Sequence, residues 1–339
     1  MKRFLRVYRF RNICCNFLLL IWFFKADMRH FRTYIFLLLI IPFFGGCIKY
    51  DLSNHKTVKN VVVIVVDGPR YSETWGDATH QHIPNMAEKL APEGVIFTNF
   101  WNNGSTFTNG GHTALLTGHY QDISNAGMEK PDYPNYLNYW LKSYNKPKEK
   151  AWFFCSKDKI EILADTKDTI WEGNYVPSVD CGNYGLGSGY RTDSVTLQHA
   201  MDTMMNYRPN LVFINLREPD YTGHTGNYEN YIAALEKVDE QYYAFWEFLT
   251  EHEYYKHNTA IFITNDHGRH LDEVGSFANH GDNCVGCRKI NLYAYGPGFG
   301  KNRIVDQPYE QIDLTTTIAE LLGMHMETSD GEVIDELFE

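Results

Sequence analysis

The sequence predicts an α/β fold in which a mostly parallel central sheet carries helices on both faces. Short apolar runs of strand length alternate along the chain with longer amphipathic stretches. The run Val61–Val66 is continuously β-branched and apolar, which is typical of a strand buried on both faces of a sheet. The alternation continues nearly to the end of the chain, so residues 60–339 are expected to form one domain.

The first half of this domain is expected to contain three strands. Val61–Val66 ends at the turn signal Asp67-Gly68-Pro69. The other elements expected here are strands Val95–Phe100 and Ala151–Cys155 and helices over 83–90, 111–116 and 134–143. Residues 172–192 are rich in Gly, Tyr and Asn and are expected to form a small cap or loop over a site. Tyr175, Tyr184 and Tyr190 in this loop are candidates to supply aromatic walls.

The second half repeats the alternation of helix and strand. The expected elements are a helix over 193–206, strand Leu211–Asn215, a long amphipathic helix from Tyr228 to about Glu251, strands Ala260–Thr264 and Ile290–Tyr295, and a helix over 309–322. Strands that alternate with helices in this way form a parallel sheet covered on both sides.

The N-terminal segment has the character of a targeting sequence. Residues 1–46 hold eight of the 31 Lys and Arg residues and one of the 42 acidic residues. Two apolar runs, 13–24 and 34–44, are each shorter than the roughly 20 residues that a spanning helix needs. The second run ends in Gly-Gly-Cys47, which is similar to a bacterial lipoprotein signal with Cys47 as the lipidated residue.

The predicted organisation is therefore a leader over 1–46, a tether over 47–59 and the domain over 60–339. Met28 is a candidate true start, and one or two retained membrane helices are the alternative to the leader. This organisation predicts an exported lipoprotein, anchored to a membrane and facing the periplasm or the cell surface. A net charge of −11 argues against a nucleic-acid partner, which would need basic surfaces.

Four cysteines lie in the predicted domain. An even number of cysteines in an exported domain indicates disulfides, here Cys284–Cys287 and Cys155–Cys181. The rival interpretation of Cys284-Val-Gly-Cys287 is half of a zinc site, but no matching second half is evident in the sequence.

Polar residues with metal-binding side chains follow several of the predicted strands. Asp67 ends the first strand, and two further segments and one loop supply the rest: Asp220 and His224 after strand 211–215, Asp266 and His267 after strand 260–264, and His280 before strand 290–295. The carboxyl ends of parallel strands meet at one edge of a sheet, where ligands bind. Alone, each of these residues is more simply interpreted as a turn, a cap or a surface residue, but together they predict a shared site.

Three Asp and three His suit two divalent ions of the zinc type. A calcium or magnesium site would use oxygen ligands almost exclusively. Six ligands exceed the needs of one tetrahedral ion, and two ions about 3.5–4 Å apart can clamp the attacking and departing oxygens of a displacement.

Thr108 is the candidate nucleophile. It is expected just before a helix, where free backbone N–H groups favour a phosphoryl group. Coordination by a metal would lower the pKa of its hydroxyl. A simple helix cap is the alternative for Thr108, and Thr106 and Ser105 are competitors for the nucleophilic role.

The ordered set of Asp67, Thr108, Asp220-x-x-x-His224, Asp266-His267-Gly268 and His280 resembles the alkaline phosphatase superfamily. The chain looks closest to its nucleotide pyrophosphatase/phosphodiesterase branch and to sulfatase-like phosphatases. The resemblance covers residues 60 to 323 and includes Leu115-Leu-Thr-Gly118, Ile83-Pro-Asn-Met-Ala-Glu-Lys-Leu and Thr317-Ile-Ala-Glu-Leu-Leu-Gly323.

The resemblance implies a role for each residue. Asp220, His224 and His280 would hold one zinc ion. Asp67, Asp266 and His267 would hold the other, with Thr108 bound to it. Thr108 would attack phosphorus and form a phosphothreonine intermediate. The backbone N–H of Asn109 is the expected oxyanion donor, from its place at the helix start.

Two departures from the family pattern bear on substrate. Sulfatases that use formylglycine need Cys or Ser at position 108 and usually Arg four residues later, where this chain has Thr108 and His112. The phosphodiesterase branch usually has Pro and Asn where this chain has Gly110 and Gly111. Asn109 or Arg70 is the candidate replacement for the missing phosphate contact, and Arg70 as a plain surface charge is the alternative.

The expected function is hydrolysis of a small-molecule phosphate ester, with diesters favoured over monoesters. Hydrolysis of sulfate esters is the second hypothesis. A surface binding protein on a catalytically silent scaffold is the third.

Overall fold

The computed structural model describes residues 19–23, 36–40 and 58–338 of the chain. Residues 1–54 and 55–339 form separate units. In the first unit, β1 (Leu19–Phe23) pairs antiparallel with β2 (Phe36–Ile40). Met28, the lipidation candidate Cys47 and the tether up to residue 57 lie outside the described residues. Among the helices that the structure describes, none is long and apolar enough to cross a membrane.

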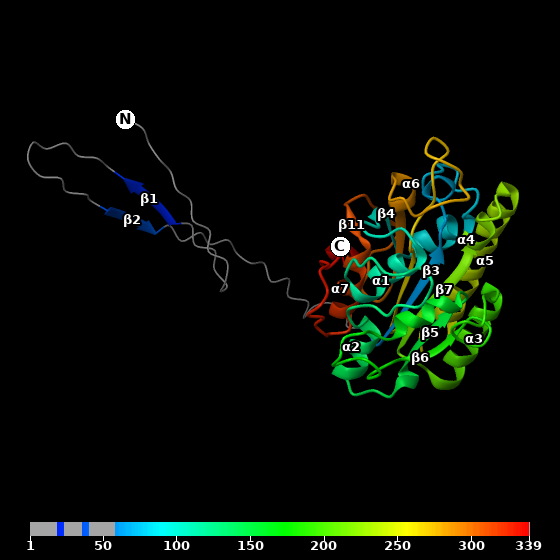
Figure 1. Cartoon of the computed structure of the whole chain (residues 1–339), viewed down its shortest axis with the longest axis horizontal. Helices are drawn as coiled ribbons and strands as arrows, with labels where there is room; N and C mark the ends of the chain where they lie inside the picture. The colour runs from blue at the N-terminus through cyan, green and yellow to red at the C-terminus, as the bar shows by residue number, and fades with distance from the viewer. Residues whose placement is uncertain (1–18, 24–35, 41–57, 339) are drawn as a thin grey trace, which may run out of the picture. The chain divides into compact units, whose positions relative to one another are not determined.

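The second unit is built on a sheet of nine strands whose pairs are mostly parallel (Figure 1). The strands are β3 (Asn60–Asp67), β4 (Val95–Trp101), β5 (Ala151–Cys155), β6 (Ser178–Cys181), β7 (Leu211–Pro219), β8 (Thr259–Asn265), β9 (Lys289–Tyr295), β10 (Arg303–Val305) and β11 (Tyr309–Glu310). Their order is β10-β4-β9-β8-β3-β7-β5-β6, and β11 pairs with β4. Only β9 among these runs antiparallel to its neighbours β4 and β8.

Helices cover both faces of this sheet, as predicted. The α-helices are α1 (Thr108–Thr117), α2 (Tyr136–Ser143), α3 (Asp193–Tyr207), α4 (Asp220–Gly223), α5 (Tyr228–Glu251), α6 (Val285–Arg288) and α7 (Gln311–Leu321), and Met86–Leu90 forms the π-helix η3. In Figure 1, α1 and α7 lie on one side of the sheet, whereas α3 and α5 lie on the other.

The alternation of side chains along β3 divides the core into two layers. Val61, Val63 and Val65 pack with apolar residues of α1, α2 and α7. Val62, Ile64 and Val66 pack with those of α3, α5 and η3. Successive residues of a strand point to opposite faces, so the continuous apolar run satisfies both layers at once.

The predicted elements are all present, with boundaries that differ by a few residues. Helix α1 begins at Thr108 and not at Gly111, so Thr108 is the first helical residue. The strands that sequence reasoning missed, β6, β10 and β11, are short and lie at or beside the sheet edges. Because β6 lies within 172–192, this segment is partly sheet and not only a cap.

The predicted disulfides are wrong for this structure, since all four cysteines of the domain are free thiols. The two cysteines of each predicted pair nevertheless lie close together. Cys155 and Cys181 face each other in register on the parallel strands β5 and β6. Both are fully buried and pack as small apolar side chains.

Candidate metal centre

Two carboxylates and an imidazole meet at the carboxyl ends of β3 and β8. Asp67 ends β3, and Asp266 and His267 follow β8 directly. Nε2 of His267 lies 3.5 Å from Oδ1 of Asp67 and 3.3 Å from Oδ2 of Asp266. All three side chains are completely buried. The adjacent parallel pairing of β3 and β8 brings together residues almost 200 positions apart.

A second group of ligands lies beside the first. Asp220 begins α4, directly after β7, and His224 follows one turn later. Nε2 of His280 lies 3.2 Å from Nε2 of His224 and 3.4 Å from Oδ1 of Asp220, and Nε2 of His224 lies 3.3 Å from the same oxygen. The His280 ring stacks on His267 at 3.9 Å between centroids. The structure therefore brings together all six predicted ligands.

The donor atoms of the first group lack hydrogen-bond partners. Oδ1 of Asp67, Oδ2 of Asp266 and Nε2 of His267 are buried and unpaired. A buried polar atom without a partner costs about 1–3 kcal/mol, and native proteins contain few of them. Three such atoms facing one another, all of types that bind zinc, fit the implied metal ion.

The two buried histidines present unprotonated nitrogens to this space. Nδ1 of His267 bonds to the carbonyl oxygen of Gly268 at 2.8 Å, and Nδ1 of His280 bonds to that of Thr106 at 2.9 Å. Nδ1 is therefore the donor in each ring, which leaves Nε2 as the acceptor. Burial lowers the pKa of His267 to about 3 and that of His280 to about 4, so both rings are neutral at pH 7.

Sequence reasoning missed two buried cations at this centre, Lys157 and Arg269. Nζ of Lys157 lies 2.9 Å from Asp67 and 2.7 Å from Asp220 and donates to the Thr108 hydroxyl at 3.4 Å. The Arg269 guanidinium bonds to Asp220 and to two backbone carbonyls. Burial is the largest single influence on the pKa of Asp220 and raises it, but Lys157, Arg269 and the neighbouring histidines together outweigh burial and hold this pKa well below its usual range. Lys157 follows β5, so the rule of strand ends applied to it as well.

Thr108 is buried at the start of α1, within reach of this centre. Its carbonyl oxygen accepts a hydrogen bond from Nδ1 of His112 at 2.8 Å, and the same ring nitrogen lies 3.2 Å from Asp266. Nε2 of His112 bonds to Asn215 of β7 at 3.1 Å. His112 thereby fixes the first turn of α1 against the carboxylate cluster.

The role expected for the Asn109 backbone needs correction. Its N–H donates to the side-chain oxygen of Asn125 at 3.0 Å, so this donor is already engaged. Both polar atoms of the Asn109 side chain are instead buried without a partner. The side-chain amide is the group of Asn109 that is free to meet a ligand.

The Arg70 guanidinium is engaged by other protein groups and does not face the candidate centre as a substrate contact. Its guanidinium donates to both carboxylate oxygens of Glu73, to Asp272 and to the carbonyl oxygen of His270. The side chains of Arg70 and Glu73 are only 4% and 8% exposed. Arg70 is thus a buried ion-pair residue, neither the phosphate contact nor the plain surface charge that the sequence suggested.

Two cavities lie near strand ends, one beside the segment that follows β5 and one beside the end of β7. One of about 550 Å³ is lined by Asn125, Met128, Lys159, Ile162, Leu186 and Tyr190, among others. Of the three candidate tyrosines, Tyr190 lies nearest the centre, with its ring 5.9 Å from Nζ of Lys157, whereas Tyr184 is 96% exposed and Tyr175 packs on Trp171.

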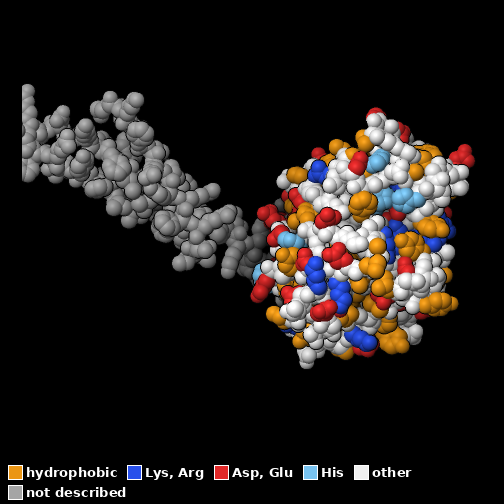
Figure 2. All heavy atoms as spheres, in the orientation of Figure 1, with side chains coloured by type: hydrophobic (Ala, Val, Ile, Leu, Met, Phe, Trp, Pro, Cys, Tyr) orange, Lys and Arg blue, Asp and Glu red, His pale blue; other side chains and the backbone are white. Residues whose placement is uncertain are grey.

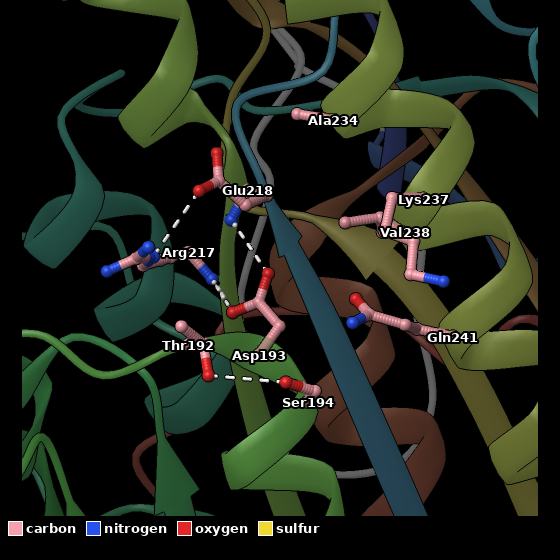
Figure 3. Close-up of a pocket in the computed structure, with 9 residues that line it drawn as sticks. All are labelled: Thr192, Asp193, Ser194, Arg217, Glu218, Ala234, Lys237, Val238 and Gln241. Carbon is pink, nitrogen blue, oxygen red and sulfur yellow. Dashed lines mark hydrogen bonds and ion pairs between the residues drawn. The ribbon is translucent and has the colours of Figure 1, made fainter. Parts of the chain in front are cut away.

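The other cavity, of about 220 Å³, lies between the start of α3, the end of β7 and α5 (Figure 3). Asp193 points toward β7 and accepts the backbone N–H groups of Arg217 and Glu218 at 2.8 and 3.1 Å. It thereby fixes the strand end that leads to Asp220.

The centre opens to the surface on one side. Figure 2 shows histidine side chains gathered in the region where α4 and the end of β3 lie in Figure 1. The His224 side chain is 48% exposed, whereas that of His280 is 5% exposed. A ligand can therefore approach from the side of α4.

Fold and site together define a member of the alkaline phosphatase superfamily, whose members are phosphoester or sulfate ester hydrolases or phosphotransferases. Within this class the chain belongs to the sulfatase family, because residues 59–324 match its family model, Sulfatase.

This chain aligns with only part of each of the following curated relatives. GPI ethanolamine phosphate transferase 1 of Candida glabrata is 25% identical over 306 residues, which cover 79% of this chain and 30% of that protein. A Formosa agariphila protein named Sulfatase is 33% identical over 94 residues, covering 28% and 18% of the two chains. The chain spans about a third of the length of the transferases that it matches.

Solved structures share the fold. Phosphonate monoester hydrolase from Silicibacter pomeroyi aligns with a TM-score of 0.60 and 16% identity over 83% of this chain and 76% of that one. Murine ectonucleotide pyrophosphatase/phosphodiesterase 5 aligns with a TM-score of 0.61 and 16% identity over 83% of this chain and all of that one.

Proposed function

We propose that this chain is a phosphoric ester hydrolase that uses two zinc ions and Thr108. The observation that carries the proposal is the convergence of six Asp and His ligands, three of their donor atoms buried and unpaired, beside one buried hydroxyl. Asp67, Asp266 and His267, with Thr108, would hold one ion. Asp220, His224 and His280 would hold the other. Such ions supply Lewis-acid stabilisation of phosphoryl oxygens and lower the pKa of bound hydroxyl groups.

Thr108 would act through a phosphothreonine. Its Oγ1 would lose its proton and form a bond to phosphorus as the bond from phosphorus to the leaving oxygen breaks, and the leaving oxygen would take up a proton to depart as an alcohol. Water would then cleave the phosphothreonine, which restores the hydroxyl and releases phosphate or a phosphomonoester. Neighbouring carboxylates hold the pKa of Lys157 above its ordinary value against the opposing effect of burial. Lys157 therefore remains an ammonium ion and stabilises negative charge on Oγ1, to which it donates.

The cavity of about 550 Å³ favours a diester. A diester needs room for the substituent that stays on phosphorus. Asn125 lines this cavity and also bonds the Asn109 N–H at the start of α1, so the cavity adjoins the nucleophile. Ile162, Leu186 and Tyr190 supply apolar walls, and Lys159 adds one amine. Burial lowers the pKa of Lys159 to about 8, so part of the protein carries a neutral amine here at pH 7–8.

An ester panel tests the proposal. The purified full chain is assayed on nitrophenyl phosphate, bis-nitrophenyl phosphate and nitrophenyl sulfate, with and without a chelator. We expect the diester to be cleaved fastest and the chelator to abolish the activity. Preference for the monoester would overturn the diester assignment, and preference for the sulfate would favour a sulfatase. Absence of both bound metal and hydrolysis would favour a silent binding scaffold.

Transfer to an alcohol is a second candidate reaction. It is favoured by the similarity to GPI ethanolamine phosphate transferase 1 over 79% of this chain. Transfer uses the same phosphothreonine and differs only in the acceptor. Adding glycerol to the diester assay separates the two reactions, because a transferase converts the released phosphoryl group into a glycerol ester, whereas a hydrolase leaves it as the free acid.

The leader predicts where this reaction occurs. We propose that lipidation at Cys47 anchors the domain to a membrane outside the cytoplasm. Feeding a radiolabelled fatty acid to cells that express the full chain should label the protein, and should not label its Cys47→Ser variant. Equal labelling of both proteins would remove Cys47 as the lipid site.

A further inference from the structure

A second cluster of metal-binding side chains lies outside the candidate centre. One donor atom from each of His270, Asp282, Cys284 and Cys287 lies within 4.8 Å of the other three. Nε2 of His270 is 3.1 Å from Oδ1 of Asp282 and is buried without a hydrogen-bond partner. Both cysteines are free thiols, and Cys287 is fully buried.

We propose that these four residues bind a structural zinc ion. Two thiolates, an imidazole and a carboxylate complete a tetrahedral set, which is the closed coordination of structural zinc sites. Thiolate ligands select zinc over calcium or magnesium. The Cys-x-x-Cys spacing is one that such sites use, and the fold supplies the second half that the sequence did not reveal.

A bound metal ion would stabilise the segment between these ligands. Residues 270–284 contain no strand or helix. Phe277 packs on Tyr228 and Tyr231, whereas Asp272, Glu273 and Val274 are exposed. Figure 1 shows the segment that leads to α6 projecting beyond the end of the sheet. Loops of this length without secondary structure are uncommon in compact domains, and a metal clip offsets the entropy of closing them.

The segment also carries a ligand of the candidate centre. His280 lies between His270 and Asp282 in sequence, and its Nε2 faces Asp220 and His224. Arg269, directly before the segment, donates to the carbonyl oxygens of Phe277 and Ala278. A zinc ion at the base of this segment would therefore hold His280 in position without contacting the substrate.

A Cys284–Cys287 disulfide is the competing state, since the predicted location is oxidising. A disulfide would join the two sulfurs but leave Nε2 of His270 buried and unpaired. Zinc binding would use all four donor atoms. The two states differ in thiol content, which makes them distinguishable in the purified protein.

Cobalt substitution tests the site independently of the proposed function. The six ligands of the candidate centre contain no sulfur, so a thiolate-to-cobalt charge-transfer band in the near ultraviolet can arise only where cysteines bind the metal. We expect the cobalt-loaded full chain to show this band and Asp266→Asn to keep it. Cys284→Ser, and separately His270→Gln in case the first variant misfolds, should lose or shift the band.

Cys181→Ala is the matched control, because Cys181 lies on β6 outside this cluster, and it should keep the band. Absence of the band from the cobalt-loaded wild type would overturn the site. So would a band of unchanged position and intensity in Cys284→Ser, because Cys287 alone should give a weaker band. So would alkylation and mass spectrometry that find Cys284 and Cys287 joined after purification without oxidant. Because these readouts do not involve ester cleavage, their failure leaves the proposed function standing, and loss of activity alone leaves the zinc site standing.

Proteolysis gives a second readout. Asp272 lies in the segment with its side chain 81% exposed. With a protease specific for acidic residues, we expect cleavage within 272–282 to be at least tenfold faster in Cys284→Ser than in the wild type, both zinc-loaded. Equal cleavage rates in the two proteins would contradict the proposal that zinc stabilises this segment.

Discussion

Two buried carboxylates near the ends of neighbouring strands have opposite environments. Asp193 accepts backbone N–H groups from Arg217 and Glu218 on its two oxygens (Figure 3). Asp67 ends β3 with Oδ1 unpaired, facing Nε2 of His267, which is also unpaired. Because a buried polar atom without a partner lowers the stability of a fold, unpaired Asp and His atoms that face one another indicate a ligand site. Paired atoms, such as those of Asp193, mark a place where hydrogen bonds hold the backbone of the fold.

We expect the largest effect on activity from removal of the candidate nucleophile. Thr108→Ala is expected to lower kcat by roughly 10³-fold or more. Its hydroxyl has one long hydrogen bond, to Lys157 at 3.4 Å, so the melting temperature should change little. Initial rates on the preferred diester and a thermal melt measure the two effects. Thr106→Ala is the matched control, and near-normal turnover by Thr108→Ala would transfer the role to another residue.

Arg70→Gln tests the supporting side of the comparison. Removing one partner of a buried ion pair costs about 3–5 kcal/mol, because Glu73 would remain buried without its cation. Urea unfolding measures this loss, while activity per folded molecule should remain at the wild-type value. In Lys301→Gln, which removes an exposed pair with Glu93, the loss should stay below about 1 kcal/mol. A raised KM in Arg70→Gln would restore Arg70 as a substrate contact.

These two residues also show how far the sequence reaches. Thr108 was predicted from its place at a helix start and from the family resemblance, and the structure places it buried at the start of α1. Arg70 follows the same strand end as Asp67, yet its direction depends on Glu73 and on Asp272, 202 positions away. Lys157 obeyed the strand-end rule and was missed because only Asp and His were sought as ligands. The sequence pattern therefore predicts at which edge of the sheet a residue lies, but not which side chains it contacts there.

The cysteines make the same point about pairing. Adjacency of Cys284 and Cys287 followed from their spacing. The approach of His270 and Asp282 to them depends on the path of a segment with no periodicity, so the sequence offered half of a site. Short edge strands such as β10 and β11 have too few residues for any period to be detected.

The pH dependence of stability sharpens the comparison at Asp193. Burial raises the pKa of Asp193 to about 6 from an ordinary 3.8. The folded state thus binds this proton more tightly than the unfolded state, so the contribution to stability is present below pH 3.8 and is lost as pH rises through 6. The full change corresponds to about 3 kcal/mol. Urea unfolding between pH 4.5 and 7 (about the span of this titration) should show a fall that is absent in Asp193→Asn. Asp202→Asn, an exposed position on the same helix, should keep the fall, and a parallel profile in Asp193→Asn would contradict this assignment.

The smallest expected effect separates the two polar groups of Asn109. The backbone N–H is bonded to Asn125, whereas the side-chain amide is buried and unpaired. We therefore expect the amide to be the group that contacts the substrate. Asn109→Ala should lower kcat/KM about tenfold, which corresponds to about 1.4 kcal/mol for one hydrogen bond. Asn125→Ala frees the backbone N–H and serves as the matched variant. If the amide makes the contact, Asn125→Ala retains kcat. If the backbone N–H is instead the oxyanion donor, Asn125→Ala raises kcat while Asn109→Ala leaves it unchanged, and the distinction between unpaired and paired groups would fail at the residue next to the nucleophile.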